Sequence, residues 1–264
     1  MPGDDRLLMR RLRLLHTSDV HIGGIHPPDE GDHHPHCTCP IHAIEHLAES
    51  HEVDLVIVAG DLFEHRRLAD DVVDGVLAHL GALSMPCVLI AGNHDVHDEA
   101  TLYGSPTIAR SGVQFFTEPE GSAMSLFDGQ LHVWSKAMPS HDRQFRPLLD
   151  VPPRPANDAW WVVLGHGHFE EEPDEKFGRS SPLSSEQIAA TGADYVALGH
   201  WHMRTDLSTA KVTAWYSGAP YGVASTGTMN LVTLDPEVGT TVEQLPVELP
   251  VAGCAADRSA GVSG

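Results

Sequence analysis

The chain has 264 residues, enough for one large domain, and its 41% hydrophobic and 20% charged residues are ordinary for a globular protein. Its formal net charge is −21, which argues against broad binding to nucleic-acid phosphates because such binding needs a basic face. No apolar run approaches the roughly 20 residues that span a bilayer, and the acidic, arginine-containing start is unlike a signal peptide. We therefore expect a cytoplasmic protein that does not enter a membrane.

Strands and helices alternate in the first part of the chain. Residues 12–19, 53–61 and 86–95 are short apolar runs that end in polar residues, which is typical of buried strands followed by loops. Residues 41–51 and 70–83 carry apolar side chains at helical spacing. This strand–helix–strand order predicts right-handed crossovers and a largely parallel sheet.

A second sheet is predicted from the later part of the chain. The short apolar segments within residues 113–134 are separated by turn residues and indicate antiparallel strands. A helix is expected over 184–192, where Ser184 and Gln187 have the spacing of a capping box. Further strands are predicted at residues 160–168, 194–202, 211–218, 228–235 and 241–249.

We expect a single domain over residues 1–251. The proline-rich stretch 152–158 is the best boundary candidate, but the polar motifs described next lie on both sides of it. Residues 252–264 are small and polar, which predicts a disordered tail.

Five predicted strands are each followed by side chains that can bind a metal ion. These side chains are Asp19 and His21, Asp61, Asn93 and His94, His166 and His168, and His200 and His202. Ligands of open α/β sheets bind at the carboxyl ends of the strands, and side chains two residues apart lie on one side of an extended segment. A two-metal site needs about this many nitrogen and oxygen donors. Imidazole, carboxylate and amide donors without thiolate suit manganese, iron or zinc.

Taken singly, each motif has an ordinary explanation. Gly-Asp at a strand end is usually a turn, and an Asp-x-His after a strand is common. Their joint occurrence in this order, all at strand ends, makes coincidence a poor explanation. Four other histidines we interpret as packed residues without a role in binding: His16, His79, His132 and His141.

The motif series resembles the calcineurin-like metallophosphoesterase superfamily, over about Leu12 to Leu249. The shared motifs are DVH (19–21), GDLF (60–63), GNHD (92–95), a histidine at 166 and GHWH (199–202). Within it, LLHTSDVHIGG, VDLVIVAGDLFE, ADYVALGHWH and YSGAP most resemble the SbcD-like DNA-repair exonuclease branch. That branch carries a DNA-contacting cap domain after its core, and little chain follows Leu249 here, so the resemblance is to the core without the cap.

The resemblance implies an α/β fold, a four-layer α-β-β-α sandwich of two mixed sheets flanked by helices. It also implies two divalent or trivalent ions (manganese, iron or zinc). Asp19, His21 and His202 would bind one ion, Asn93, His166 and His200 the other, and Asp61 both. His94 would act on the leaving oxygen as a general acid, and Asp95 would orient it. For the histidine after the fourth strand, His166 is favoured over His168, which would lie near substrate or water.

The implied reaction is hydrolysis of a phosphomonoester or phosphodiester by in-line attack of a metal-bridging hydroxide. The net charge and the acidic stretch 170–176 favour a small or nucleotide-like substrate, with Arg66 and Arg67 as candidate phosphate contacts. The first alternative is a DNA exonuclease or endonuclease of the repair type. A non-catalytic binding scaffold is the second, although it predicts gaps in the ligand set that this sequence does not have. The sequence reveals no ATPase partner and leaves an oligomer open.

The segment Gly31 to His42 is an insertion beside the predicted metal cleft. It is rich in histidine and cysteine, and its auxiliary candidates are His36, Cys37 and Cys39. Three interpretations stay open: a polar lip, an auxiliary metal site, or a lid that brings a histidine to the substrate. The four cysteines of the chain do not suggest a disulfide framework, which agrees with a reducing compartment.

Overall fold

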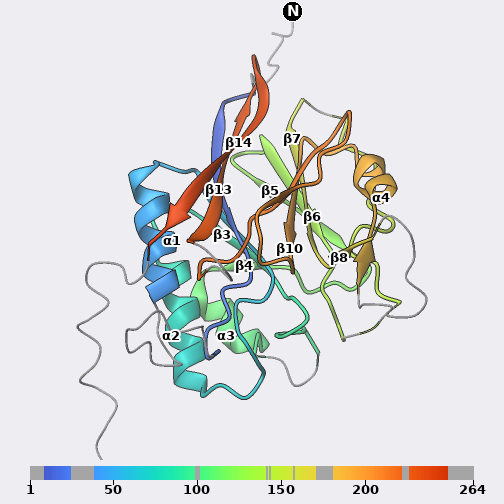
Figure 1. Ribbon diagram of the computed structural model, residues 1–264. Helices are drawn as coiled ribbons and strands as arrows, with labels where there is room; N and C mark the ends of the chain where they lie inside the picture. The colour runs from blue at the N-terminus through green and yellow to red at the C-terminus, as the bar shows by residue number, and fades with distance from the viewer. Residues whose placement is uncertain are drawn as a thin grey trace, which may run out of the picture.

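The computed structural model describes residues 9–24, 39–98, 102–140, 142, 144–156, 158–170, 181–221 and 226–248 (Figure 1). Its helices are α1 (Cys39–Ser50), α2 (Asp70–Gly81), α3 (Ser105–Ser111) and α4 (Ser185–Ala190). Its longer strands are β1 (Leu12–Thr17), β2 (Leu55–Ala59), β3 (Cys87–Ile90), β5 (Ser122–Leu126), β6 (Leu131–Ser135), β7 (Trp160–His166), β10 (Tyr195–Gly199), β12 (Thr213–Tyr216), β13 (Gly227–Asp235) and β14 (Gly239–Val247). Its two-residue strands are β4 (Gln114–Phe115), β8 (His168–Phe169), β9 (Pro182–Leu183) and β11 (Thr205–Asp206).

Two six-stranded mixed sheets contain most of these strands. The first has the order β14-β13-β1-β2-β3-β4, and the second has the order β11-β12-β10-β7-β6-β5. In the first sheet β1 to β4 run parallel, and β13 and β14 are antiparallel neighbours at one edge. In the second sheet the four inner strands run parallel and each edge strand is antiparallel to its neighbour. The predicted pair of mixed sheets is confirmed.

Apolar side chains form three layers, because strand residues alternate between the two faces of each sheet. In β2, Val56 and Val58 pack toward α1 and α2, whereas Leu55 and Ile57 pack between the two sheets. The outer face of the second sheet packs against α4 through Ile188. Figure 1 shows α1, α2 and α3 on one side of the molecule and α4 on the other, so the layers run α-β-β-α as expected.

Two local elements differ from the sequence-based expectation. The helix α3 was not anticipated, since seven residues are too few to show a clear helical period. The strand β4 pairs in parallel with β3 in the first sheet, where we expected an antiparallel strand of the second sheet. Two residues carry no register information of their own, so long-range packing decides where they pair. The capping box at Ser184 and Gln187 is confirmed.

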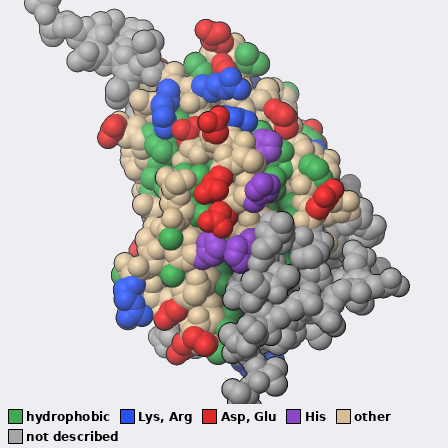
Figure 2. Space-filling model, turned by 90° about the vertical axis from the view of Figure 1, so that its left-hand side faces the viewer, with side chains coloured by type: hydrophobic (Ala, Val, Ile, Leu, Met, Phe, Trp, Pro, Cys, Tyr) green, Lys and Arg blue, Asp and Glu red, His purple; other side chains and the backbone are tan. Residues whose placement is uncertain are grey.

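Several histidines lie away from the strand ends, on the helices of the first layer. Nε2 of His79 in α2 lies within hydrogen-bond distance, 3.0 Å, of a carboxylate oxygen of Glu45 in α1, and the His79 ring lies 5.1 Å from that of His42. Figure 2 shows histidine and acidic side chains close together on this side of the molecule. His79 is therefore half-exposed rather than packed in a core, and His132 in β6 is half-buried. His141 lies outside the described residues.

His16, by contrast, is fully buried between the sheets, as predicted. Its Nδ1 lies 2.7 Å from the hydroxyl of Tyr195 in β10, so this pair joins the two sheets. Burial lowers the pKa of His16 to about 3, because the apolar surroundings disfavour the charged ring. Among the described residues no helix is long and apolar enough to cross a membrane.

His16 should make folding sensitive to mild acid. The unfolded chain binds a proton at this histidine below about pH 6.5, whereas the folded chain does so only near pH 3, so stability falls as the pH drops through this window. The loss is at most about 1.4 kcal/mol per pH unit. We expect the free energy of unfolding of the metal-free protein, measured with urea, to depend less on pH in His16→Gln than in wild type. The difference in slope should reach up to this value per pH unit. The exposed control His46→Gln should retain the wild-type slope, and equal slopes for His16→Gln and wild type would contradict the prediction.

Candidate metal centre

The loops that follow β1 and β2 run side by side, and this pairing positions two carboxylates. The amide of Asp19 donates to the carbonyl of Gly60 at 3.0 Å, and the amide of His21 donates to the carbonyl of Asp61 at 3.1 Å. The amide of Ile22 continues the pattern with Leu62 at 2.9 Å. Because parallel strands end at the same edge, both aspartates lie beyond that edge of the first sheet.

Four of the predicted ligands have left-handed backbone conformations. Their φ angles are 54° at Asp19, 51° at His21, 52° at Asp61 and 103° at His200. A residue with a Cβ atom in this region costs about 1–3 kcal/mol and persists only when its surroundings hold it there. The paired loops hold the first three residues of this set, so the fold maintains strain at the edge where the side chains converge.

One group of potential ligands combines residues after β1 and β10. Asp19, His21 and His202 each offer an atom, and these atoms lie within 4.8 Å of one another. The Nε2 atoms of the two histidines are 3.1 Å apart, and Nε2 of His202 lies 3.7 Å from an oxygen of Asp19. The backbone amide of His200 donates to both oxygens of Asp19, at 3.1 and 3.0 Å, which fixes the carboxylate.

The second group combines residues after β2, β3, β7 and β10. Asp61, His166 and His200 offer atoms within 4.8 Å of one another. The side-chain oxygen of Asn93 joins them, at 3.1 Å from Nε2 of His166 and 2.8 Å from Nδ1 of His200. Asp61 also interacts electrostatically with Asp19 and His21 of the first group. All seven predicted ligands therefore meet at one site, and Asp61 is near both groups.

The contacts of the Nδ1 atoms of two histidines turn their Nε2 atoms toward the other potential ligands. Nδ1 of His166 lies 2.8 Å from the carbonyl oxygen of Ala59, which can only accept, so Nδ1 carries the hydrogen and Nε2 faces Asp61 at 3.2 Å. Nδ1 of His21 lies 2.8 Å from a carboxylate oxygen of Glu64, and the negative charge there favours a hydrogen on Nδ1. Such outer partners orient histidine ligands in metal proteins.

The charges of the site also suit a cation. Burial lowers the pKa values of His21 and His200 to about 3, so both rings are neutral at neutral pH, as metal ligands must be. Burial raises the pKa of Asp19. For Asp61, the nearby His166 outweighs burial and holds the pKa of the carboxyl well below its usual range. Asp61 in turn raises the pKa of His166 to about 9, although burial opposes this, so a metal ion would take the place of the proton that this ring holds beside Asp61 at neutral pH. Buried carboxylates among nitrogen donors therefore fit two metal ions.

His94 lies at the open side of the first group. Its side chain is 38% exposed, and its ring centroid is 4.7 Å from that of His21. Its Nδ1 lies 2.9 Å from the backbone carbonyl oxygen of Glu64, and its backbone amide donates to Asp61 at 2.9 Å.

Asp95 has a different set of partners from the one we expected. Its carboxylate is fully buried and accepts hydrogen bonds from the amides of Gly92 at 2.7 Å and Phe63 at 3.1 Å, and from the hydroxyl of Tyr103. These bonds tie together the loops after β2 and β3. The contact to Nδ1 of His94 belongs instead to Glu64, so Asp95 supports His94 through the loop rather than by that bond.

Glu64 is the functional residue that sequence reasoning missed. Its carboxylate contacts Nδ1 of His21 at 2.8 Å and lies 3.5 Å from Nδ1 of His94, and these three residues form a further group that could hold a metal ion. Its backbone amide donates to the carbonyl of Ile22 at 3.0 Å. The signal was its place directly after Gly-Asp-Leu-Phe, the motif that supplies Asp61.

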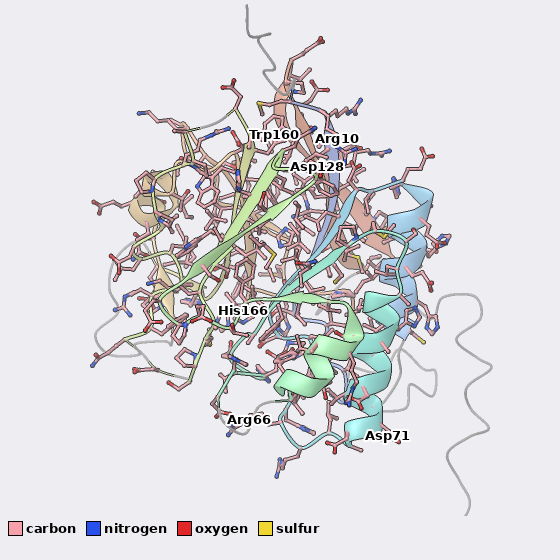
Figure 3. All side chains as sticks on the ribbon, turned by 180° about the vertical axis from the view of Figure 1, so that it is seen from behind. Arg10, Arg66, Asp71, Asp128, Trp160 and His166 are labelled. Carbon is pink, nitrogen blue, oxygen red and sulfur yellow. The ribbon has the colours of Figure 1, made fainter. Side chains whose placement is uncertain are left out.

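The remaining predicted residues are distributed as follows. His168 is half-buried in β8, 5.7 Å between ring centroids from His200, whereas His166 belongs to the second ligand group. Arg66 forms an ion pair with Asp98, and Arg67 is exposed. Figure 3 shows His166 inside the molecule and Arg66 at its periphery.

The insertion is described only at its end. His36 and Cys37 lie outside the described residues. Cys39 begins α1, where it is buried and disulfide-bonded. A disulfide sulfur carries no thiolate with which Cys39 could serve an auxiliary metal site, whereas Cys87 in β3 is a free, buried cysteine.

Comparisons with known proteins agree with this geometry. Residues 12–204 match the family model of calcineurin-like phosphoesterases. The chain is 26% identical over 271 residues to the SbcD component of the SbcCD nuclease of Bacillus subtilis (strain 168), and the match covers 84% of this chain. This chain spans 66% of the length of that relative.

Solved structures share the fold. The protein TT1561 of Thermus thermophilus superposes with a TM-score of 0.53 at 12% identity, over 90% of this chain and 100% of that one. A dimetal phosphatase from Danio rerio superposes with a TM-score of 0.52 at 12% identity, over 89% and 98% of the two chains. At such identities the likeness concerns the fold alone.

Glycine is required beside Asp61. A Cβ atom at Gly92 would lie 2.1 Å from Oδ1 of Asp61, inside any real contact distance. Gly92→Ala should therefore displace the carboxylate and weaken Mn²⁺ binding at least tenfold in calorimetric titration. At Gly75 in α2 an added Cβ meets nothing within 4 Å, so Gly75→Ala should keep the metal affinity and gain up to about 1 kcal/mol of stability. Equal metal affinity in the two variants would contradict this account.

Glu64→Gln should weaken metal binding because it removes the negative charge that lies 2.8 Å from Nδ1 of His21. Removal of such an outer partner costs about 10–100-fold in affinity or activity. Mn²⁺ titration of Glu64→Gln against the exposed control Glu49→Gln tests this. An unchanged affinity in Glu64→Gln would show that His21 is oriented without the carboxylate.

Proposed function

Because this chain belongs to the calcineurin-like phosphoesterase family, we propose that it hydrolyses a small or nucleotide-like phosphomonoester or phosphodiester with the help of two metal ions. It is a phosphoric ester hydrolase of this family. The observation that carries the proposal is the meeting of two potential ligand groups at one sheet edge, with Asp61 near both.

The proposed ligands divide between the two ions. Asp19, His21 and His202 would hold one ion, Asn93, His166 and His200 would hold the other, and Asp61 would bind both. When bound, two such ions supply Lewis-acid stabilisation of charge on the phosphoryl oxygens and lower the pKa of a water molecule. The donor set suits manganese, iron or zinc.

We propose that His94 delivers the proton to the leaving oxygen. Its Nδ1 faces a backbone carbonyl, which only accepts, so Nδ1 carries a hydrogen and the second proton of the charged ring sits on Nε2. Burial opposes the charged form, but Asp61, the backbone carbonyl of Glu64 and the carboxylates of Glu64 and Asp95 raise the pKa of His94 above its ordinary value. His94 therefore retains a transferable proton nearer to neutral pH than a free imidazole.

A small ester is favoured over a long polyanion. The formal net charge is −21, and Arg66, at the periphery of the molecule, is engaged by Asp98. The alternative is a nuclease, which the similarity to the SbcCD nuclease component of Bacillus subtilis supports. A non-catalytic scaffold is disfavoured because all seven predicted ligands are present and converge.

A panel of substrates tests the proposal. With Mn²⁺ present, hydrolysis of bis(p-nitrophenyl) phosphate or p-nitrophenyl phosphate should exceed that of labelled duplex DNA. Asp61→Asn should abolish turnover, because it removes the negative charge shared by both groups. Unchanged turnover in Asp61→Asn would support the scaffold, and processive duplex degradation as the fastest reaction would support the nuclease.

The dependence of kcat on the leaving group tests the proposed role of His94. His94→Gln should lower kcat by about 10²–10⁴-fold on esters of poor leaving groups such as phenol. The loss should be much smaller on p-nitrophenyl esters, whose leaving oxygen needs little protonation. The half-buried control His132→Gln should show no such dependence, and an equal loss on both kinds of ester would contradict the proton-donor role.

A further inference from the structure

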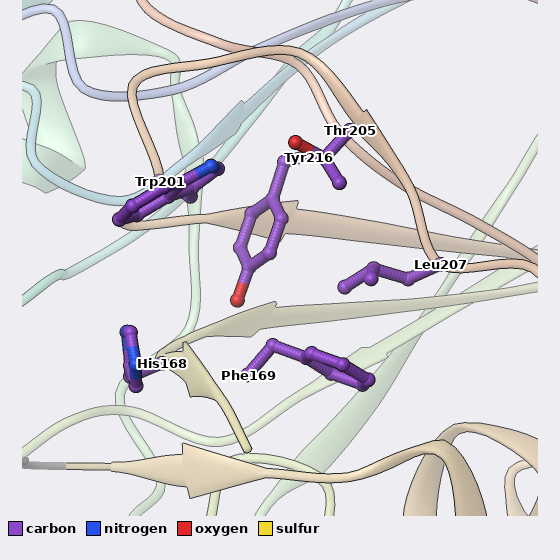
Figure 4. A pocket seen from close by; sticks show the side chains of 6 residues that line it. All are labelled: His168, Phe169, Trp201, Thr205, Leu207 and Tyr216. Carbon is purple, nitrogen blue, oxygen red and sulfur yellow. The ribbon is translucent and has the colours of Figure 1, made fainter. Parts of the chain in front are cut away.

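An apolar pocket adjoins the candidate metal centre on the outer side of the second sheet. It has a volume of about 190 Å³ and is lined by His168, Phe169, Trp201, Thr205, Leu207 and Tyr216. These residues come from β8, from the segment that joins β10 to β12, and from β12 itself. Figure 4 shows the aromatic side chains of His168, Phe169, Trp201 and Tyr216 around this space.

His168 connects this pocket with the centre. Its ring forms one wall of the pocket and lies 5.7 Å from the ring of His200, a proposed ligand of the second ion. Its ring also lies 6.2 Å from that of Trp201, which directly follows His200 in the chain. His168 is therefore the residue that the pocket shares with the surroundings of the second ligand group.

The walls determine what the pocket can hold. Three of the six described residues that line it are Phe, Trp and Tyr, and none of these six is an aspartate, glutamate, lysine or arginine, so the described walls offer no oppositely charged side chain to a second phosphate or another charged group. The hydroxyl of Tyr216 donates to the carbonyl of Gly167 at 2.6 Å, which fixes its ring as a rigid surface. Aromatic walls stack flat rings, and they do so with every base because each base has a π-face.

The volume of the pocket limits the size of the group that it can hold. Its 190 Å³ is less than the roughly 300–1,000 Å³ of pockets that enclose a whole drug-sized ligand. One ring system with its phosphate outside, at the metal centre, matches this volume. A base paired and stacked within a duplex cannot reach such a pocket without being turned out of the helix.

We propose that this pocket binds the planar aromatic group, a nucleobase or an aryl ring, of the phosphoester that the metal centre hydrolyses. The proposal rests on the proposed function and names its substrate class: esters with one free aromatic group beside the phosphate. His168 is then a substrate contact and Trp201 a stacking surface.

Binding to the metal-loaded protein tests the proposal independently of turnover. Calorimetric affinities are compared for adenosine monophosphate against ribose 5-phosphate, and for phenyl phosphate against methyl phosphate, with hydrolysis followed separately. We expect each aromatic ligand to bind about tenfold or more tightly than its aliphatic counterpart, since stacking of one base is worth about this much. A gain for adenosine monophosphate alone identifies a nucleobase site, and a gain for phenyl phosphate alone identifies an aryl site. No gain in either pair overturns the proposal.

Leu207→Trp locates the effect by filling the pocket. The ratio of affinities for adenosine monophosphate and ribose 5-phosphate should collapse toward one in this variant. It should persist in the control Val238→Trp, which places the same bulk on an exposed residue in the turn between β13 and β14. A ratio unchanged by Leu207→Trp would place the ring elsewhere and overturn the proposal. An aromatic preference without hydrolysis of any ester would support the pocket and count against the proposed function alone.

Discussion

The backbone hydrogen bonds between the loops after β1 and β2 are the constraint on which the candidate site depends. They hold Asp19, His21 and Asp61 in left-handed conformations that side chains ordinarily avoid. They also bring two carboxylates together in a buried place, where the charges repel each other and burial penalises each. Cations bound between them would offset both costs, so the fold prepares a site for positive charge.

The second sheet completes the donor set from the opposite side. His166 ends β7, and His200 and His202 follow β10, so the carboxyl ends of these parallel neighbours face those of β1 and β2. The buried pair His16 and Tyr195 joins β1 to β10 between the sheets, three residues before Asp19 in the chain. Each ligand group combines residues from both sheets, so the packing of one sheet against the other brings the two halves of each group together.

At the candidate centre, some residues are proposed ligands of the metal ions and others are proposed to act on the substrate. Glu64 contacts His21 through its carboxylate and His94 through its carbonyl, so one residue links a proposed ligand to the proposed proton donor. Asp95 fixes the loops on either side. Next to the second group, the pocket lined by Phe169, Trp201 and Tyr216 offers an aromatic stacking surface. The ions and carboxylates of the metal centre offer no such surface.

The sequence by itself determined the alternation of strands and helices, because burial patterns at periods of two and 3.6 are local. It also determined which residues could be ligands, because Asp19, Asp61 and His200 each follow an apolar run at a predictable sheet edge. Only the tertiary structure places His166 in a group of potential ligands and His168 outside it, and only it revealed Glu64, whose partners lie 30 and 43 positions away. The strand β4 and the aromatic pocket likewise arise from contacts between segments distant in the chain, which no local pattern records.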